Sequence, residues 1–319
     1  MMQPIGGYFS LELPHHEEYH KDALRLNTGR NCLEYILRAR GYKKVYIPYY
    51  TCDVVLEPFH KLKVEYEFYH IDINFELAQV ITLQEGEALL YTNYYGLKQS
   101  YVEILSKQYG NQLIVDNTQA FYAKPIPGID TFYTCRKFFG VPDGAYLYTN
   151  KMIDMELEQD VSWNRMSFLT KRLDLGAEAG YMDFREQSGS LVGQPIKLMS
   201  RLTHSMMQSI DYEVAFKQRR SNYMILQQSL GETNKLKSSL DIECVPMVYP
   251  YLTDDGEQLR QYLINNKVFV AKYWPNVVNW TSANSYEFLL TNLLIPVPID
   301  QRYGIDDMYL IIDIIRSFV

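Results

Sequence analysis

Residues 112–149 read QLIVDNTQAFYAKPIPGIDTFYTCRKFFGVPDGAYLYT and contain three short β-rich runs, at 112–116, 131–135 and 144–149. Short runs of this kind, separated by Gly- and Pro-containing turns, predict successive strands of one sheet. The acidic Asp116 ends the first run, and a lone lysine, Lys137, follows the second. This spacing raises the question of which ligand needs a carboxylate and an amine at those two places.

The same alternation extends across residues 24–150. Further strands are predicted at KKVYIPY (43–49), VEYEFYHI (64–71) and ALLYTNYY (88–95), and helices at NCLEYILRAR (31–40) and SYVEILSKQYG (100–110). Strands that alternate with helices are typical of an α/β sheet with covering helices. In such sheets ligands bind beyond the carboxyl ends of the strands, so Asp116 is expected at a ligand site.

The remainder of the chain has a different pattern. Residues 155–230 are predicted to be mostly helical, interrupted by the polar stretch 185–195, with a long connecting helix over 196–230. Strands are predicted at 244–252 and 268–274, and helices around 256–266 and 305–318. We therefore expect a large α/β domain at residues 1–205, and a connector helix with a small C-terminal α+β domain at residues 206–319.

Composition narrows the class of protein. The chain has 319 residues, 47% of them hydrophobic, and a net charge of −7 without a long basic run, which argues against nucleic acid as a partner. The start of the chain has no secretory pattern and no run reaches 18 apolar residues, so neither secretion nor a membrane span is expected. Four scattered cysteines without a CxxC pair favour a reducing cytoplasm.

Two local features have more than one interpretation. Thr28, Gly29 and Arg30 directly precede a predicted helix, so their backbone N–H groups could bind a phosphate or could simply cap the helix. The cluster PHHEEYH (14–20) has the residue types of a metal site. No further ligand set at fixed spacing supports metal binding, and we expect no metal.

Taken in order, five blocks make the chain recognisable: LNTGRNCLEYIL, VYIPYYTCDVV with YEFYHID, VDNTQAF, CRKFFGVPDGAYL and LLIPVPIDQRYGIDDM. Together they resemble the DegT/DnrJ/StrS-type sugar aminotransferases, which are pyridoxal-phosphate enzymes of the aspartate-aminotransferase fold (fold type I). The resemblance implies a large domain with a mostly parallel central sheet and a small C-terminal α+β domain. It also implies pyridoxal 5'-phosphate as the cofactor.

The resemblance assigns two catalytic residues. Asp116 matches the acidic residue that keeps the pyridine nitrogen of the cofactor protonated, so that the ring can accept electrons. Lys137 matches the lysine that bonds to the cofactor aldehyde and later shuttles a proton, which requires a lowered pKa. Without the resemblance, a strand-end turn residue and a surface lysine would be the ordinary interpretations.

Other cofactor contacts follow from the same blocks. Gln119 matches the residue beside the ring oxygen, and the phosphate is expected at Thr28, Gly29, Arg30 and Thr134. Arg136 could add charge there or could be structural. Where the family commonly places a large side chain on the ring, this chain has Cys52. Either Cys52 makes a smaller contact, or Tyr50 or Tyr95, which are also candidate substrate contacts, covers the ring.

The resemblance implies a cytoplasmic homodimer that transfers an amino group, with glutamate as the expected donor, to a nucleotide-linked keto sugar. Surface-polysaccharide or antibiotic biosynthesis is the usual pathway. Tyr181 or Asn164 is expected to reach the partner's cofactor. Two alternatives stay open: a pyridoxal-phosphate-dependent sugar dehydratase or lyase, and a non-catalytic regulatory protein that retains the fold. Some dehydratases of the family carry histidine in place of lysine, so Lys137 argues against that branch.

Overall fold

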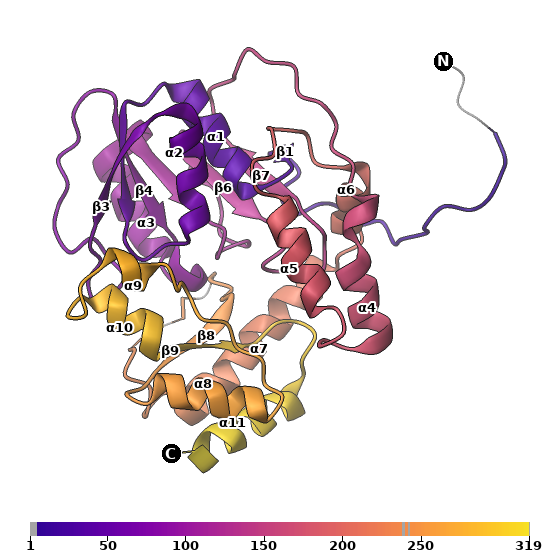
Figure 1. Cartoon of the computed structure of the whole chain (residues 1–319), viewed down its shortest axis with the longest axis vertical. Coiled ribbons are helices and arrows are strands. Elements are labelled where there is room, and N and C mark those ends of the chain that lie inside the picture. The colour runs from indigo at the N-terminus through magenta and orange to yellow at the C-terminus, as the bar shows by residue number, and fades with distance from the viewer. Residues whose placement is uncertain (1–4, 238–239, 242, 319) are drawn as a thin grey trace.

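A computed structural model describes residues 5–237, 240–241 and 243–318 of the chain. It contains a large seven-stranded sheet flanked by helices and, beside it, a small two-stranded sheet with its own helices (Figure 1). The strands of the large sheet are β1 (Leu24–Leu26), β2 (Lys44–Pro48), β3 (Glu65–Tyr69), β4 (Glu87–Thr92), β5 (Leu113–Asp116), β6 (Asp130–Thr134) and β7 (Ala145–Tyr148). The α/β class is therefore confirmed.

The large sheet has the strand order β1-β7-β6-β5-β4-β2-β3. Pairing is parallel from β3 across to β6, and β7 runs antiparallel to both of its neighbours. The predicted mostly parallel sheet is therefore present. Parallel neighbours bring their carboxyl ends to one edge, and this places the end of β5 beside the end of β6.

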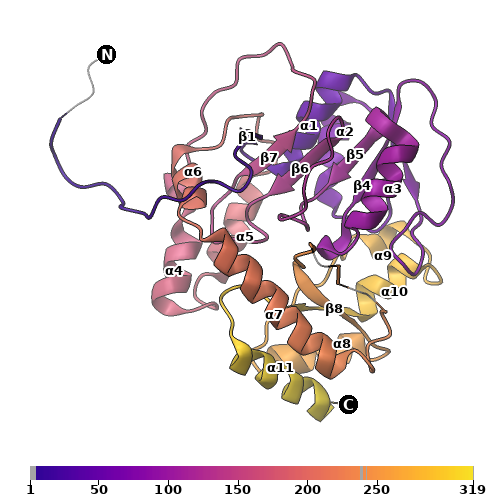
Figure 2. The same ribbon diagram turned by 180° about the vertical axis from the view of Figure 1, so that it is seen from behind.

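Helices cover both faces of this sheet (Figures 1 and 2). On one face lie α1 (Gly29–Arg40) and α2 (Glu57–Leu62), and on the other lies α3 (Gln99–Tyr109). Alternate strand residues feed the two cores: Ala88 and Leu90 pack with the α1 cluster, whereas Leu89 and Tyr91 pack on the opposite side. A period of two along buried strands is what a sheet covered on both faces requires.

The middle of the chain forms more and shorter helices than predicted. Its helices are α4 (Ser167–Leu175), α5 (Tyr181–Ser190), α6 (Arg201–Gln208) and α7 (Tyr212–Leu230). The predicted single helix over 196–230 is wrong, because Ser200 and Asp211 each cap the start of a separate helix by accepting a backbone N–H. The polar stretch 185–195 does not interrupt the helices at its start, since α5 continues through Ser190.

The small sheet pairs β8 (Val248–Leu252) antiparallel with β9 (Leu294–Pro298). Around it lie α8 (Gly256–Asn265), α9 (Val277–Trp280), α10 (Tyr286–Leu293) and α11 (Ile305–Phe318). The predicted strand at 268–274 is wrong: this segment is irregular, with Val268 in the core of the small sheet and Trp274 packed in the core beside the large sheet. Its apolar spacing reflects these two anchor points and not a pleated strand.

Arg219 of α7 joins the two parts of the fold. Its guanidinium is buried and donates hydrogen bonds to the backbone oxygens of Phe138 and Met247, at 3.0 and 3.1 Å, and to the side chain of Gln301 at 2.9 Å. It also lies over the Phe138 ring, 4.5 Å from the centroid. The helix is thereby tied both to the turn that carries Lys137 and to the ends of the small sheet.

A membrane-spanning helix needs about 20 mostly apolar residues. Within the described ranges, no helix combines that length with that apolarity. The predicted division at residues 205 and 206 stays a prediction.

We expect Arg219→Met to lower the free energy of unfolding by about 3 kcal/mol or more, because two buried backbone oxygens and the half-buried Gln301 would lose a charged donor. Urea denaturation followed by circular dichroism measures the change. Lys217→Met on the same helix is the matched control, since Lys217 is exposed and pairs only with Glu213. Its effect should stay within about 0.5 kcal/mol, and equal losses in both variants would contradict the role given to Arg219.

Candidate functional site

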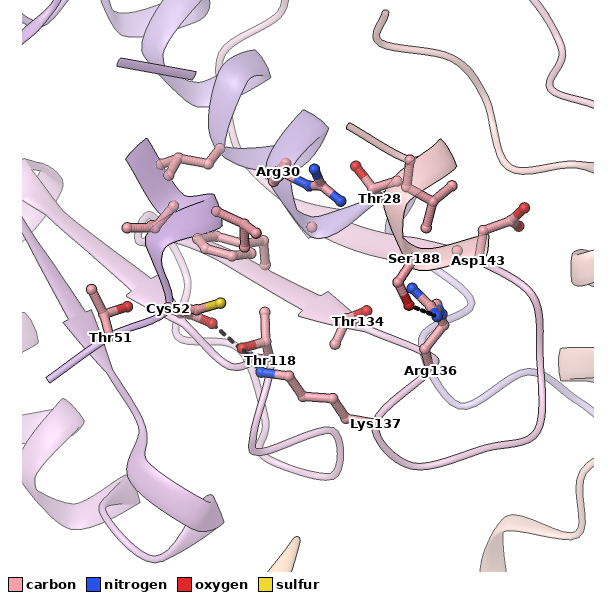
Figure 3. Close-up of a pocket in the computed structure, with 18 of the residues that line it drawn as sticks. Thr28, Arg30, Thr51, Cys52, Thr118, Thr134, Arg136, Lys137, Asp143 and Ser188 are labelled. Atoms are coloured by element: carbon pink, nitrogen blue, oxygen red, sulfur yellow. Dashed lines mark hydrogen bonds between the residues drawn. The ribbon is translucent and has the colours of Figure 1, made fainter. Parts of the chain in front are cut away.

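A cavity of about 420 Å³ opens at the carboxyl edge of the large sheet. Its walls come from the start of α1, the ends of β4, β5 and β6, the turn after β6, helix α5 and Trp274 from the C-terminal part of the chain. Figure 3 shows the polar side chains that line it. Segments far apart in the sequence therefore contribute to one concave site.

Strand geometry explains why three polar side chains meet here. Asp116 lies two residues beyond Ile114, which packs on the α1 face of the sheet, and Thr134 lies two residues beyond Phe132 on the same face. Thr92 pairs in register with Asp116 on the neighbouring strand. Since side chains two apart point to the same face, all three are directed toward the start of α1.

Asp116 is a buried carboxylate with 7% of its surface exposed. Its Oδ1 accepts a hydrogen bond from the backbone N–H of Thr118 at 2.8 Å, the usual arrangement of an Asx turn. Burial raises the pKa of Asp116, and the nearby Lys137 amine opposes that rise. A cationic ring nitrogen beside this carboxylate would supply the counter-charge that the protein only partly provides.

Lys137 follows β6 and extends across the cavity toward Thr118 (Figure 3). Its Nζ donates a hydrogen bond to Thr118 Oγ1 at 3.0 Å. The side chain remains accessible from the open cavity, but the surrounding protein displaces bulk water and so lowers the pKa of the amine, with Asp116 and Cys52 opposing the shift. A lowered pKa is the property that a lysine nucleophile or proton carrier requires.

The start of α1 forms the opposite wall. Thr28 is the N-cap, and its Oγ1 accepts the backbone N–H of Asn31 at 3.2 Å. The first turn contains no acidic residue, so the positive end of the helix dipole is not neutralised there. Arg30 lines the cavity, but its guanidinium already pairs with Glu57 at 2.7 Å.

The turn after Lys137 is anchored to this helix start. The Gly144 N–H donates to the backbone oxygen of Asn27 at 2.7 Å. Gly144 has φ +99°, and a Cβ there would lie 2.8 Å from Thr203, so only glycine fits without strain. The adjacent Asp143 is fully buried and accepts hydrogen bonds from Ser162 and Arg165, both at 2.6 Å.

Most of the predicted site residues lie on this cavity. Those that line it are Thr28, Gly29, Arg30, Cys52, Asp116, Thr134 and Lys137. Gln119, Tyr50 and Tyr95 are not among the lining residues and are buried. The structure thus brings together the carboxylate, the amine and the helix start that sequence reasoning singled out, and it leaves Gln119 and the two tyrosines outside the cavity lining.

The two tyrosines pack against each other instead, with their hydroxyls 3.1 Å apart. Tyr50 also donates to the backbone oxygen of Tyr273 and stacks edge-on against Trp274. As placed here, neither covers a ring bound in the cavity, whereas Cys52 does line it. Gln119 accepts the Tyr95 N–H at 2.8 Å, and its amide nitrogen has no hydrogen-bond partner among the described residues.

Several lining residues were missed by sequence reasoning. They include Asn27, Thr51, Thr92, Thr118, Phe132, Phe184, Ser188 and Trp274, whereas Arg136, for which a charge contribution was one of two expectations, also lines the cavity. Thr118 was accessible to prediction, because the second residue after a strand-end Asp commonly closes an Asx turn. Ser188 and Trp274 had no local signal, since only the tertiary fold brings α5 and the segment after α8 to this edge.

Comparison with known proteins places the fold. No family model and no curated protein matches the sequence. Among solved structures, a DegT/DnrJ/EryC1/StrS aminotransferase from Brucella abortus is similar with a TM-score of 0.63 and 15% identity, covering 94% of this chain and 89% of that one. The sugar aminotransferase CalS13 from Micromonospora echinospora has a TM-score of 0.63 and 12% identity, covering 93% and 88%. GDP-4-keto-6-deoxymannose-3-dehydratase (ColD) has a TM-score of 0.62 and 15% identity, covering 94% and 93%.

We expect Asp116→Asn to stabilise the protein at pH 7 when no cofactor is added. The folded-state pKa of Asp116 is raised, so the stability that its proton gives is present at low pH and is lost as the pH rises through that folded pKa. Asparagine removes this loss and can still accept the Thr118 N–H. Thermal melts at pH 7 and pH 5 measure the gain, which should shrink at the lower pH.

The exposed Asp174→Asn serves as the control and should change neither melt. If Asp116→Asn were less stable than the wild type at pH 7, the carboxylate would be a structural group, and burial would not be making its ionised form unfavourable.

Proposed function

Because the chain has the fold of the DegT/DnrJ/EryC1/StrS-type sugar aminotransferases, we propose that it is a pyridoxal-phosphate-dependent aminotransferase. Its substrates are glutamate as amino donor and a nucleotide-linked keto sugar as acceptor. One observation carries the proposal: a buried carboxylate, Asp116, and an amine of lowered pKa, Lys137, share a cavity with an uncompensated helix start.

The residues present fit this cofactor. Pyridoxal phosphate, when bound, supplies an aldehyde and a ring that accepts the electron pair released at the substrate carbon. The buried Asp116 suits a protonated ring nitrogen, and the first-turn N–H groups at Gly29 and Arg30 with the hydroxyl of Thr134 suit a phosphate. The Thr28 hydroxyl lines the same site but donates to Asn31 Oδ1. The unpartnered amide nitrogen of Gln119 offers a further donor close to the site.

Each catalytic residue then has a defined task. With the cofactor bound, Asp116 would keep the proton on the ring nitrogen, because its carboxylate is shielded from water and would gain a cationic partner. Lys137 takes and returns the substrate proton through its Nζ, which Thr118 Oγ1 holds at 3.0 Å. The protein's displacement of water from Lys137 favours the neutral amine that this transfer needs.

The dehydratase alternative keeps one supporting observation, the similarity to ColD. The same cofactor site would serve it, so the two activities differ in the fate of the substrate. Lys137 favours amino transfer, because an amine at this position can return a proton to the cofactor carbon. A non-catalytic descendant would have no need for an Asp116 whose burial opposes its ionisation.

We also propose that the protein is a homodimer. Large apolar side chains are exposed together in the region of α4 and α5: Trp163 74%, Leu173 86%, Leu175 71%, Tyr181 57% and Met182 69%. Large apolar side chains that stay exposed in one region are typical of association sites. Asn164 is exposed beside Trp163, and Tyr181 begins α5, so both could reach a partner's site as expected from the resemblance.

When the wild-type protein has bound pyridoxal phosphate, glutamate alone should transfer its amino group to the cofactor, without any sugar present. The visible absorption of the lysine-linked cofactor should disappear, and 2-oxoglutarate should be released in a stoichiometric amount. Lys137→Ala should slow this half-reaction at least about 1,000-fold, since it removes both the covalent link and the proton carrier. Stopped-flow absorbance and mass spectrometry of the keto acid measure the two products.

The exposed Lys124→Ala and Lys151→Ala are the matched controls and should react normally. Borohydride reduction before digestion should attach the cofactor mass to the peptide containing Lys137. Attachment to another lysine would refute the catalytic assignment, and a loaded protein inert to glutamate but able to dehydrate a keto sugar would favour the alternative activity.

Light scattering should give twice the chain mass of 37.5 kDa. Leu173→Glu should shift the protein toward monomer, because a charge in the α4–α5 surface must be desolvated on association. Leu310→Glu on α11 is the control, as its side chain is also exposed, at 57%, but lies outside that surface. A monomeric wild type would contradict the proposed dimer. Dissociation by Leu310→Glu but not by Leu173→Glu would contradict the proposed location of the interface.

A further inference from the structure

Arg136 and Lys137 are adjacent in the chain but serve different parts of the cavity. Lys137 Nζ donates to Thr118, whereas Arg136 Nη2 donates to Ser188 Oγ of α5 at 3.0 Å (Figure 3). The Arg136 guanidinium also lies over the Phe184 ring, 5.5 Å from the centroid. One turn thus delivers two cationic groups, and only Lys137 has a task in the proposed reaction.

The charge of Arg136 is unpaired within the described part of the chain. Across residues 5–237, 240–241 and 243–318 it takes part in no ion pair. Its Nε is buried without a hydrogen-bond partner in that same part of the chain. Arg30, the other guanidinium on this cavity, is paired with Glu57 at 2.7 Å. Arg30, the cationic residue that the sequence predicted at the phosphate, therefore already has a carboxylate partner.

Asp143, the acidic side chain that opposes the lowered pKa of Arg136, is already engaged by other partners. Asp143 is fully buried and is held by Ser162, Thr203 and Arg165. Burial lowers the pKa of Arg136 to about 10, Asp143 partly opposes the shift and Arg30 adds to it. The group remains a cation at neutral pH, and a buried cation without an anion is costly unless a ligand supplies one.

We propose that Arg136 supplies the positive charge that binds the phosphate of the cofactor. Thr134, two residues earlier, and Thr28 with Gly29 at the start of α1 line the same cavity. The Thr134 hydroxyl and the backbone N–H groups of the first helical turn would contribute uncharged donors. Arg136 adds the charge-assisted hydrogen bonds that a phosphate dianion favours, with a free Nε and a planar fork. The inference rests on the proposed cofactor and predicts strong selection of pyridoxal phosphate over unphosphorylated pyridoxal.

Dissociation constants for pyridoxal phosphate and for pyridoxal, measured by equilibrium dialysis, test this directly. R136M should raise the dissociation constant of pyridoxal phosphate by about 10- to 100-fold, the loss of affinity expected when a charged hydrogen-bonding partner is removed. The affinity for pyridoxal should change less than about threefold, within the usual scatter of such effects. R136K should recover part of the loss, because it keeps the charge but not the fork.

Arg185→Met is the matched control, since Arg185 lies exposed on α5. It should leave both constants unchanged. Inorganic phosphate should compete with pyridoxal phosphate for the wild type and much less for R136M. If R136M does not fold, as judged by circular dichroism, R136Q removes the charge but keeps a polar side chain and should show the same selective loss.

The outcomes separate the two proposals. If R136M loses affinity for pyridoxal phosphate and for pyridoxal equally, and R136K recovers neither, Arg136 has a structural role and the inference is overturned. Unchanged cofactor binding with a higher KM for the sugar substrate places the anion on the substrate and also overturns it. A wild type that binds neither ligand refutes the proposed function itself. A wild type that binds both with similar affinity refutes only the role of Arg136.

Discussion

The parallel pairing of β5 with β6 is the constraint on which the site depends. It sets Asp116 at the end of one strand and Lys137 just beyond the end of the next, on the edge of the sheet that faces the start of α1. The turn that follows is held by the Gly144 N–H bond to Asn27 and by Arg219, which donates to the backbone of Phe138. The two functional groups are thus placed by backbone geometry more than by contacts between their own side chains.

The cavity concentrates groups whose electrostatic state is unfavourable without a ligand. Burial raises the pKa of Asp116 and lowers those of Lys137 and Arg136. Shifts in these directions mean that each group is less stable in its charged form than it would be in water. A ligand with a cationic ring nitrogen and an anionic phosphate would complement the carboxylate and the guanidinium at once. Perturbed groups that gather in one cleft are a physical indication of a functional site.

Sequence reasoning located the sheet and its ligand edge, because buried strands and strand-end residues leave local patterns. The strands at 43–49 and 112–116 and the helix at 31–40 are confirmed within a few residues. Of the two strands of the small sheet, only β8 was predicted. The sequence of β9 contains two prolines, which are unusual in strands. The apolar residues of 268–274 pack into two cores and do not form a strand. Ser188 and Trp274 reach the cavity only through tertiary packing. The pairing of Arg30 with Glu57 spans 27 residues and has no sequence signature.

The measurement that tests the central claim most directly is a crystal structure of the protein grown with pyridoxal phosphate. The account predicts that the cofactor lies in the cavity, bonded to Lys137 Nζ, with its ring nitrogen within hydrogen-bond distance of Asp116. Its phosphate should meet the start of α1 and the Arg136 guanidinium. A cavity without the cofactor at saturating concentration, or a cofactor whose ring nitrogen faces away from Asp116, would contradict the account.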